Sequence, residues 1–346
     1  MTGDGEQQTA KAENAARSVL GERAEPSERF FYHSFPRRGR STDSEIDKGC
    51  KILSLICDAG LVLAPELVKW RYPHADGSPP REQQTIQRRI CFTELAPGEL
   101  IEHAKEFGHF ALEFDVHTLK RLGAMPVFYI PQEPDNDEQG STSLGATLVV
   151  QAIDAMILAM RIAGVKSILD DPATTQSTLD CTFGFQAERL KTFTLNVPEA
   201  RTVIEGFTHA LTPPDMLEQA LTGLLSCFYP ADNLRDNKAL AYYRQREWRI
   251  AWNFAINGEE VMRQPSDEVV SRLIEIDADF SGRNFETPQG IVQLARTSWI
   301  LPGFGGRRIV ELANRVVVPR AALASAKAIL ARIAPSVAVV CIEDLE

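Results

Sequence analysis

The stretch from Arg89 to Pro131, RICFTELAPGELIEHAKEFGHFALEFDVHTLKRLGAMPVFYIP, constrains the fold of this chain more than any other. Three segments rich in aromatic and β-branched residues, Arg89–Thr93, His109–Phe114 and Met125–Ile130, alternate with two helical segments, which predicts core strands of one sheet. Polar side chains nevertheless lie in or beside these strands: Thr93, Glu94, His103, His109, Glu113 and Tyr129. Since a sheet that keeps polar groups near its centre usually has a use for them, we expect a functional site here.

The rest of the chain predicts an α+β fold with a mixed or antiparallel central sheet and packed helices. A strand at Arg29–Phe35, a helix at Ser44–Ala59 and a final strand at Val337–Ile342 follow no regular strand–helix alternation, which argues against a doubly wound parallel sheet. Residues 1–28 are poor in large apolar side chains and predict a disordered tail. Residues 29–346 predict a single domain, with a helical insertion at about 144–227.

Local patterns predict several further segments. We expect Trp70–Gln84 and Phe228–Leu240 to be loops, because turn-forming residues gather in both. Gln132–Ser143 is acidic and polar and predicts a surface or disordered segment. A helix over Pro265–Arg272 followed by a strand over Leu273–Ile276 is expected near the C-terminal third.

Composition and charge indicate a soluble globular protein: 44% of residues are hydrophobic, 24% are charged and the net charge is -10. An acidic chain of this kind argues against non-specific binding of a nucleic-acid backbone. The six cysteines show no CxxC pair and no zinc-ligand spacing, so we expect reduced thiols and no metal.

The most apolar run, Leu144–Val165, is interrupted by Gln151, Asp154 and Arg161, which predicts a packed helix rather than a membrane span. The N-terminal residues do not form a charged segment followed by an apolar one, as a secretory signal does. We therefore expect a cytoplasmic protein that does not enter a membrane.

Glu247 is the first candidate for chemistry. In YRQREWRI, strand alternation would place Trp248 and Ile250 on one face and Glu247 with Arg249 on the other. A carboxylate between arginines is either a structural ion pair or a site carboxylate that its neighbours hold ionised.

Three further polar residues have two interpretations each. His33 follows three aromatic residues on the first strand and is either a core residue or a ligand contact. His103 precedes Phe107 by one helical turn and either packs on it or contacts a ligand. Thr93 and Glu94 end a strand, where such residues also cap the following helix, and capping is the interpretation we prefer for Glu94.

A set of separated motifs resembles a family of bacterial abortive-infection (phage-resistance) proteins of the AbiGi type, classed as antitoxins. The segments RICFTEL, EHAKEFGHFALEFD, LGAMPVFYIP and YYRQREWRI carry the resemblance, and FYHSF with KILSLICDAGLVLAPE matches the family's start. The pattern places Phe92, Thr93, His103, Gly108, Pro126, Val127, Tyr129, Glu247 and Arg249 at the family's positions. It implies an anti-phage protein that binds a protein partner encoded by a neighbouring defence gene.

The layout of a first-strand histidine, a following helix, an I-x-F-T strand and a late-strand glutamate is also similar to ADP-ribosyltransferases. That similarity implies NAD as the cofactor, with His33 anchoring it, Glu247 as the catalytic carboxylate, and Thr93 or His103 at the middle position. Phe92, Tyr129 and Arg249 are the further cofactor contacts that the two resemblances imply. The middle position departs from the pattern, since many such enzymes have a Tyr or a Ser-Thr-Ser run there.

Three functions are consistent with these observations. The first is an NAD-dependent ADP-ribosyltransferase or NAD glycohydrolase that acts as a toxic effector in phage defence. The second is a non-enzymatic antitoxin that binds a toxin, for which acidic charge is suited. The third is a nucleic-acid-directed protein, based on two basic clusters that are more simply solvated loops: Arg37, Arg38 and Arg40, and Arg81, Arg88 and Arg89.

Overall fold

A computed structural model of the chain describes residues 28–36, 45–72, 81–131, 144–183, 191–210, 213–231, 246–251, 255–256, 259–287 and 290–345. The fold is α+β and is built on a mixed central sheet, as predicted. The tail predicted for residues 1–28 and the segment predicted for 132–143 lie outside the described residues, except for residue 28.

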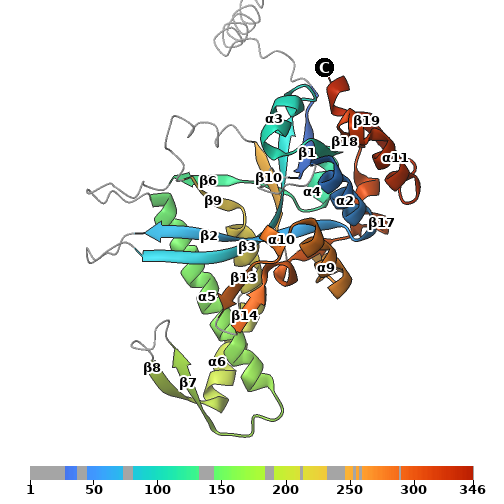
Figure 1. Cartoon of the computed structure of the whole chain (residues 1–346). Helices are drawn as coiled ribbons and strands as arrows, with labels where there is room; N and C mark the ends of the chain where they lie inside the picture. The colour runs from blue at the N-terminus through green and yellow to red at the C-terminus, as the bar shows by residue number, and fades with distance from the viewer. Residues whose placement is uncertain are drawn as a thin grey trace, which may run out of the picture.

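The central sheet has one parallel strand pair, and its other pairs are antiparallel. Its main path runs in the order β15 (Trp299–Leu301), β2 (Leu61–Tyr72), β3 (Arg81–Leu95), β1 (Phe30–Phe35), β4 (Phe110–Phe114), β18 (Arg315–Val318) and β19 (Ala338–Cys341). β10 (Glu247–Ala251) pairs with β3 and with β5 (Met125–Pro126) off this path. The predicted strands around Arg89–Thr93 and His109–Phe114 therefore meet in one sheet with β10, which contains Glu247 (Figure 1).

The sheet is split along one edge of β3. Arg89 pairs with Ala64 of β2 on one side and with Ala251 of β10 on the other. Thr93 pairs with Tyr32 of β1 on the first of these edges and with Glu247 of β10 on the other. β1 and β2 therefore share the same edge of β3, and neither pairs with the residues between Arg89 and Thr93, because β2 turns away to pair with β15.

Helices cover both faces of the half that contains β1. The main core lies between the sheet and α2 (Glu45–Asp58), α4 (Val116–Arg121) and α11 (Leu323–Ala331), where Leu53, Leu119 and Leu330 are buried. On the opposite face, α3 (Glu99–Phe107) packs its Leu100 and Ala104 in a smaller cluster. The apolar stripe that predicts α2 in the sequence is thus its buried face.

A helical excursion separates β6 (Phe128–Pro131) from its parallel partner β9 (Phe228–Ala231). It contains α5 (Leu144–Asp170), the antiparallel pair β7 (Thr178–Phe183) and β8 (Lys191–Asn196), α6 (Val197–Ala210) and α7 (Pro214–Leu225). Figure 1 shows α5 running away from β2 and β3 toward α6 and the β7–β8 pair. The excursion occupies the part of the chain where a helical insertion was expected.

α5 is packed along one side only. Among the described residues it is the helix long and apolar enough to cross a membrane, with a mean hydropathy of 1.8 over its most apolar window, and 22% of that window is buried. Val149, Val150 and Ile153 pack against Trp70 of β2, whereas Leu148 and Leu158 are exposed. The expected packed helix is therefore packed on its inner side, and most of its apolar window is exposed.

The remaining elements surround β15 and the C-terminal strands. They are α9 (Asp267–Ile276), α10 (Ala278–Ser281), the pairs β11 (Ala255–Ile256) with β12 (Glu259–Glu260), β13 (Asn284–Thr287) with β14 (Gly290–Gln293), and β16 (Gly303–Phe304) with β17 (Arg307–Arg308), and the 3-10 helices Leu294–Thr297, Ile309–Leu312, Arg320–Ala322 and Ile342–Asp344.

Three local predictions are wrong. The predicted loop Trp70–Gln84 is strand at both ends, because β2 continues to Tyr72 and β3 begins at Arg81, and its residues 73–80 lie outside the described residues. Phe228–Ala231 is the strand β9 and not part of a loop. Leu273–Ile276 continues the helix α9, which Ser266 caps by accepting a hydrogen bond from the Val269 amide.

Phe92 tests the core, because its side chain is fully buried against Phe114 and Ile250 on the face opposite Thr93. We expect Phe92→Ala to lower the free energy of unfolding by about 3–5 kcal/mol through the cavity it leaves. Urea unfolding followed by circular dichroism measures this loss. The matched control Ile291→Ala removes an exposed side chain and should change stability by less than about 0.5 kcal/mol. Equal effects of both variants would contradict the assignment of Phe92 to the core.

Candidate active site

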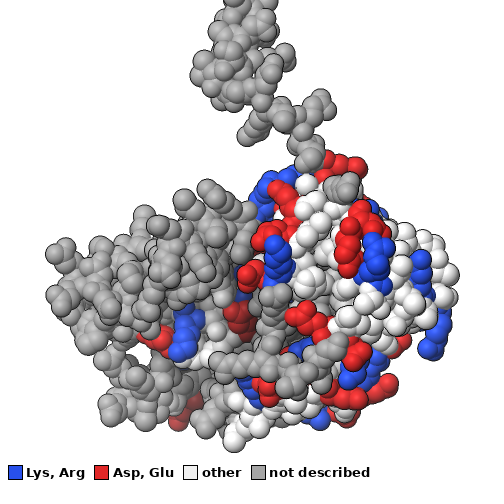
Figure 2. All heavy atoms as spheres, turned by 45° about the horizontal axis from the view of Figure 1, so that its top comes forward, with Lys and Arg blue, Asp and Glu red and all other residues white. Residues whose placement is uncertain are grey.

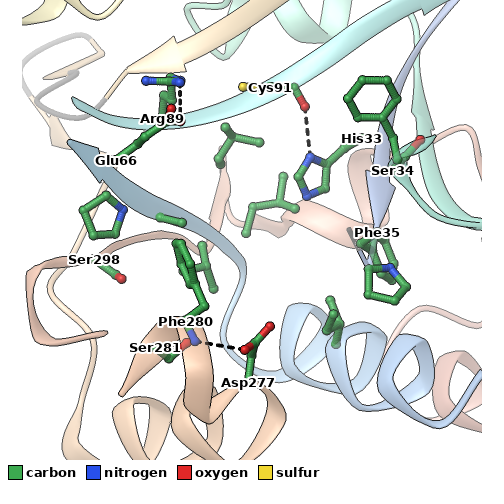
Figure 3. Close-up of a pocket in the computed structure, with 18 of the residues that line it drawn as sticks. His33, Ser34, Phe35, Glu66, Arg89, Cys91, Asp277, Phe280, Ser281 and Ser298 are labelled. Atoms are coloured by element: carbon green, nitrogen blue, oxygen red, sulfur yellow. Dashed lines mark hydrogen bonds and ion pairs between the residues drawn. The ribbon is translucent and has the colours of Figure 1, made fainter. Parts of the chain in front are cut away.

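The gap in the sheet opens into a pocket of about 1260 Å³. Residues from both faces of the sheet line it, from Ile52 and Leu55 of α2 on one face to Thr93 and His103 on the other. Figure 3 shows His33 on one side of the pocket, Arg89 with Glu66 on the other, and Phe280 of α10 across from them. The pocket is larger than the roughly 300–1,000 Å³ typical of small-molecule sites.

His33 stands at the split itself. Its side chain belongs to the core face of β1, and its Nδ1 lies 3.0 Å from the carbonyl oxygen of Cys91, in the part of β3 that neither β1 nor β2 pairs with (Figure 3). Because a carbonyl only accepts, Nδ1 carries the proton in this bond. His33 also lines the pocket.

Glu247 accepts hydrogen bonds on both carboxylate oxygens. Arg249 Nε donates to Oε1 at 2.7 Å, and the Tyr129 hydroxyl donates to Oε2. Burial would raise the pKa of Glu247, but the adjacent Arg249 guanidinium outweighs burial and holds that pKa below its usual range. The carboxylate is therefore ionised at neutral pH, as expected for a carboxylate that neighbouring arginines hold ionised.

The Glu247 carboxylate affects the ionisation of both Arg249 and Tyr129, which donate hydrogen bonds to it. Arg249 is 2% exposed, so its charge depends on Glu247 and on the Ser226 carbonyl, which accepts from Nη1 at 3.2 Å. Burial and the charge of Glu247 raise the pKa of Tyr129. Tyr129 thus stays a neutral hydrogen-bond donor across the physiological range.

Cys91 connects the two candidate residues that lie farthest apart in the sequence. Its carbonyl accepts from His33, and its thiol lies within the influence of the Glu247 charge. Burial, and then the charge of Glu247, raise the pKa of this thiol. One residue of β3 therefore lies beside His33 at one edge of the strand and beside Glu247 on one face of it.

Thr93 and His103 form a second pair at the same wall. Thr93 lies directly opposite Glu247 in the β3–β10 register, and its hydroxyl is 3.2 Å from His103 Nε2. His103 also stacks on Phe107, with ring centroids 4.3 Å apart, and its Nδ1 is 3.5 Å from the Ser34 hydroxyl. Burial lowers the pKa of His103 to about 4, so the ring is neutral at pH 7 and positions Thr93.

A second carboxylate–arginine–tyrosine set lies in the same pocket. Glu66 of β2 pairs with Arg89 of β3 and accepts from the Tyr229 hydroxyl at 2.9 Å. The guanidinium carbons of Arg89 and Arg249 each lie 4.9 Å from the centre of the Tyr229 ring. Tyr229 thereby joins this set to the one around Glu247.

Sequence reasoning missed Glu66, Tyr229 and the role of Arg89. Arg89 lies two residues before Cys91 and four before Thr93, and this period of two was the available signal for a shared face. Tyr229 gave no signal, because its strand was expected to be a loop. Glu66 was not singled out, and its partner Arg89 was assigned to a basic cluster in a solvated loop.

Two predicted roles are wrong. Phe92 does not line the pocket and belongs to the core, because strand alternation turns it away from Thr93. Glu94 does not cap α3, whose N-cap is Gly98. Glu94 instead pairs with Arg29 at 3.1 Å and with Arg246 at 3.6 Å. His33, Thr93, His103, Tyr129, Glu247 and Arg249 all line the one pocket.

The expected basic clusters are not solvated patches in the part of the chain that the structure describes. Arg89 is buried against Glu66, and Arg88 is half-buried and donates to the Thr297 carbonyl. Arg37, Arg38 and Arg40 lie outside the described residues. On the face of the molecule that Figure 2 shows, Lys and Arg are interspersed with Asp and Glu over the described residues.

The described residues include no group of three His, Cys, Asp or Glu side chains that could hold a metal ion. Comparisons of the chain with protein-family models, with curated proteins and with solved structures gave no match. The site is therefore interpreted from its own geometry.

The low pKa of His103 predicts a specific pH dependence. Between pH 6.5 and about 4 the unfolded chain binds a proton at His103 that the folded protein does not bind, so stability falls as the pH decreases through this window. The loss should amount to roughly 1–3 kcal/mol. In His103→Gln this part of the slope should disappear, as measured by urea unfolding at a series of pH values. Identical slopes in both proteins would show that His103 is not held neutral.

Proposed function

We propose that this protein cleaves the bond between nicotinamide and ribose in NAD, as an NAD glycohydrolase or ADP-ribosyltransferase. The observation that carries the proposal is that His33 and Glu247 both line one pocket at the gap in the sheet, on either side of Cys91 and from opposite faces of the sheet. These residues come from the first and the late strand of the sheet. A split sheet with a histidine at the gap and a glutamate beside it supports an ADP-ribosyltransferase-like layout.

Glu247 would act on the charge that develops as the bond breaks. The electron pair of the bond leaves with the nicotinamide ring nitrogen, which becomes neutral, and positive charge moves to the ribose C1′ and ring oxygen. An ionised carboxylate held in place by Arg249 and Tyr129 stabilises that charge without reorganising. Water or an acceptor nucleophile then bonds to C1′ and releases its proton to solvent.

The other residues of the wall suit binding of the same ligand. His33 lines the pocket next to Cys91, and an imidazole there suits a hydrogen bond with a ribose hydroxyl. Thr93 lies opposite Glu247 and is positioned by His103. The volume of about 1260 Å³ leaves room for a ligand of dinucleotide size.

In the cell, we propose that this activity makes the protein a cytoplasmic toxic effector in phage defence. The support is the resemblance of its motifs to abortive-infection proteins, and Thr93, His103, Tyr129, Glu247 and Arg249 of that pattern lie together in the pocket wall. Depletion of NAD, or modification of an essential acceptor, would stop growth of the infected cell.

A second function, a non-enzymatic antitoxin that binds a protein partner, is supported by a different observation. Both oxygens of Glu247 are already bonded within the chain, which is the arrangement of a structural ion pair. The net charge of -10 suits a basic toxin as the partner. In this case the pocket would keep its layout without turning over NAD.

The test is NAD consumption by the purified full chain, followed as nicotinamide release by liquid chromatography. Glu247→Gln keeps the shape of the side chain but removes the charge, so we expect the rate to fall about 100-fold or more. The matched control Glu94→Gln makes the same chemical change at a residue that does not line the pocket. It should retain the wild-type rate, and thermal unfolding should show that both variants are folded.

Toxicity on expression in bacteria should follow the same order, with Glu247→Gln harmless and Glu94→Gln toxic. NAD that stays intact for hours with pure wild-type protein, with and without RNA, DNA or protein acceptors, would overturn the enzymatic proposal. Recovery of a neighbouring gene product in a pull-down, together with harmless expression of the wild type, would favour the antitoxin.

A further inference from the structure

The pocket extends beyond the candidate active site to a second group of residues on the opposite face of the sheet. Glu247 lies on the face of β10 opposite Ile250, and Ile250 belongs to the main core. α2 covers that core face, and its Ile52 and Leu55 line the same pocket together with Leu273 of α9. The pocket therefore continues through the gap in the sheet to a largely apolar wall beside α2, α9 and α10.

Three buried polar side chains interrupt this apolar wall. They are Lys48 of α2, Ser281 of α10 and Ser298, which are 8%, 7% and 4% exposed and all line the pocket. Within the part of the chain that the structure describes, neither serine hydroxyl is hydrogen-bonded to another residue, and neither is fully enclosed. Because buried hydroxyl groups normally have a partner, these two are available to a ligand in the pocket.

The charges at this wall are balanced. Lys48 Nζ donates to Asp277 Oδ2 at 2.5 Å, and the other N–H groups of this ammonium have no partner among the described residues. Asp277 Oδ1 accepts from the Phe280 amide at 3.0 Å, so the ion pair also holds the start of α10. Asp279 and Arg283, which line the pocket nearby, are again one charge of each sign. A carboxylate beside the ammonium ion would repel an anionic ligand, whereas an uncharged ligand with hydroxyl groups can bond to both.

Phe280 adds an exposed aromatic ring to the same wall. Its side chain lines the pocket although the residue is 40% exposed, and Figure 3 shows it on the same side of the pocket as Ser281 and Ser298. An aromatic ring that faces open space in a pocket can stack on a planar group, and every nucleobase offers such a face. A planar ring joined to hydroxyl groups, without net charge, is the chemistry of a nucleoside.

We propose that this wall, the α10 subsite, binds a nucleoside, with its base stacked on Phe280 and its hydroxyl groups bonded to the buried polar side chains. The subsite consists of Lys48, Asp277, Phe280, Ser281 and Ser298. That the nucleoside is adenosine rests on the proposed function, because NAD joins adenosine through a pyrophosphate to the nicotinamide ribose. The adenosine half then lies on the α2 side of the sheet, and the bond that breaks lies beside Glu247 on the other side. A pocket of about 1260 Å³, larger than most small-molecule sites, is consistent with two subsites.

The experiment measures adenosine binding to the purified full chain by isothermal titration calorimetry, which needs no catalysis. Phe280→Ala should weaken binding about tenfold or more, because the stacking surface is lost, and Phe280→Trp should retain it. Ser298→Ala should weaken binding severalfold without unfolding the protein, since its hydroxyl has no partner within the described residues. The matched control Phe193→Ala removes a 44% exposed ring that does not line the pocket, and it should bind adenosine as the wild type does.

Further measurements separate the α10 subsite from the catalytic proposal. Glu247→Gln should bind adenosine as the wild type does, even where it no longer cleaves NAD. Adenosine binding that depends on Phe280, in a protein that leaves NAD intact, would support the subsite and overturn only the catalytic proposal. NAD cleavage with the same KM in the wild type and in Phe280→Ala, without adenosine binding, would overturn the subsite and leave catalysis standing. Binding of octanoate that Phe280→Ala abolishes, without binding of adenosine, would assign the wall to apolar anions and overturn the subsite as well.

Discussion

The arrangement of the site depends on one hydrogen bond, from His33 Nδ1 to the carbonyl of Cys91. A buried backbone carbonyl within a sheet needs a partner, and a strand edge normally supplies it. β1 and β2 leave the edge of β3 on either side of Cys91, and the imidazole takes the place of the missing strand there. The sheet can therefore open into a pocket without leaving this acceptor unpaired. The same bond fixes the tautomer of His33, so that structure and chemistry are set together.

Opening the sheet has an electrostatic consequence. Polar and charged side chains that face a gap in the core lose part of their hydration, and each charge then needs a partner. The pocket meets this need twice, with Glu247, Arg249 and Tyr129 in one set and Glu66, Arg89 and Tyr229 in the other. Because the tyrosines donate and the arginines carry positive charge, both carboxylates are held in fixed positions, and the pKa of Glu247 is lowered.

The sequence was sufficient to predict which face of a strand a residue occupies where polar and apolar residues alternate over several positions. The alternation in Glu247–Ile250 placed Glu247 and Arg249 on one side of a strand, and the structure confirms that face. Phe92 was assigned to the site because it stands beside Thr93 in a motif, although the same alternation turns it into the core. A motif records neighbours in the sequence, whereas each face of a strand is formed by every second residue.

Long-range pairing explains most of what was missed. Phe228–Ala231 contains Pro230 and has the local composition of a loop, and it becomes a strand only because β6 lies parallel to it. Tyr229 reaches the pocket through that pairing, opposite Tyr129. Likewise, Arg88 and Arg89 resemble a surface cluster until β2 and the Thr297 carbonyl are placed beside them. No window of the sequence contains the partners that decide these roles.

α5 connects the pocket wall to the surface of the molecule. The cluster that holds its inner side contains Val68, Trp70 and Tyr229, and Tyr229 lies between the guanidinium groups of Arg89 and Arg249. Packed side chains move together, because protein interiors contain few voids to absorb a shift. The inner side of α5 and the pocket wall around Tyr229 are thus parts of one packed unit.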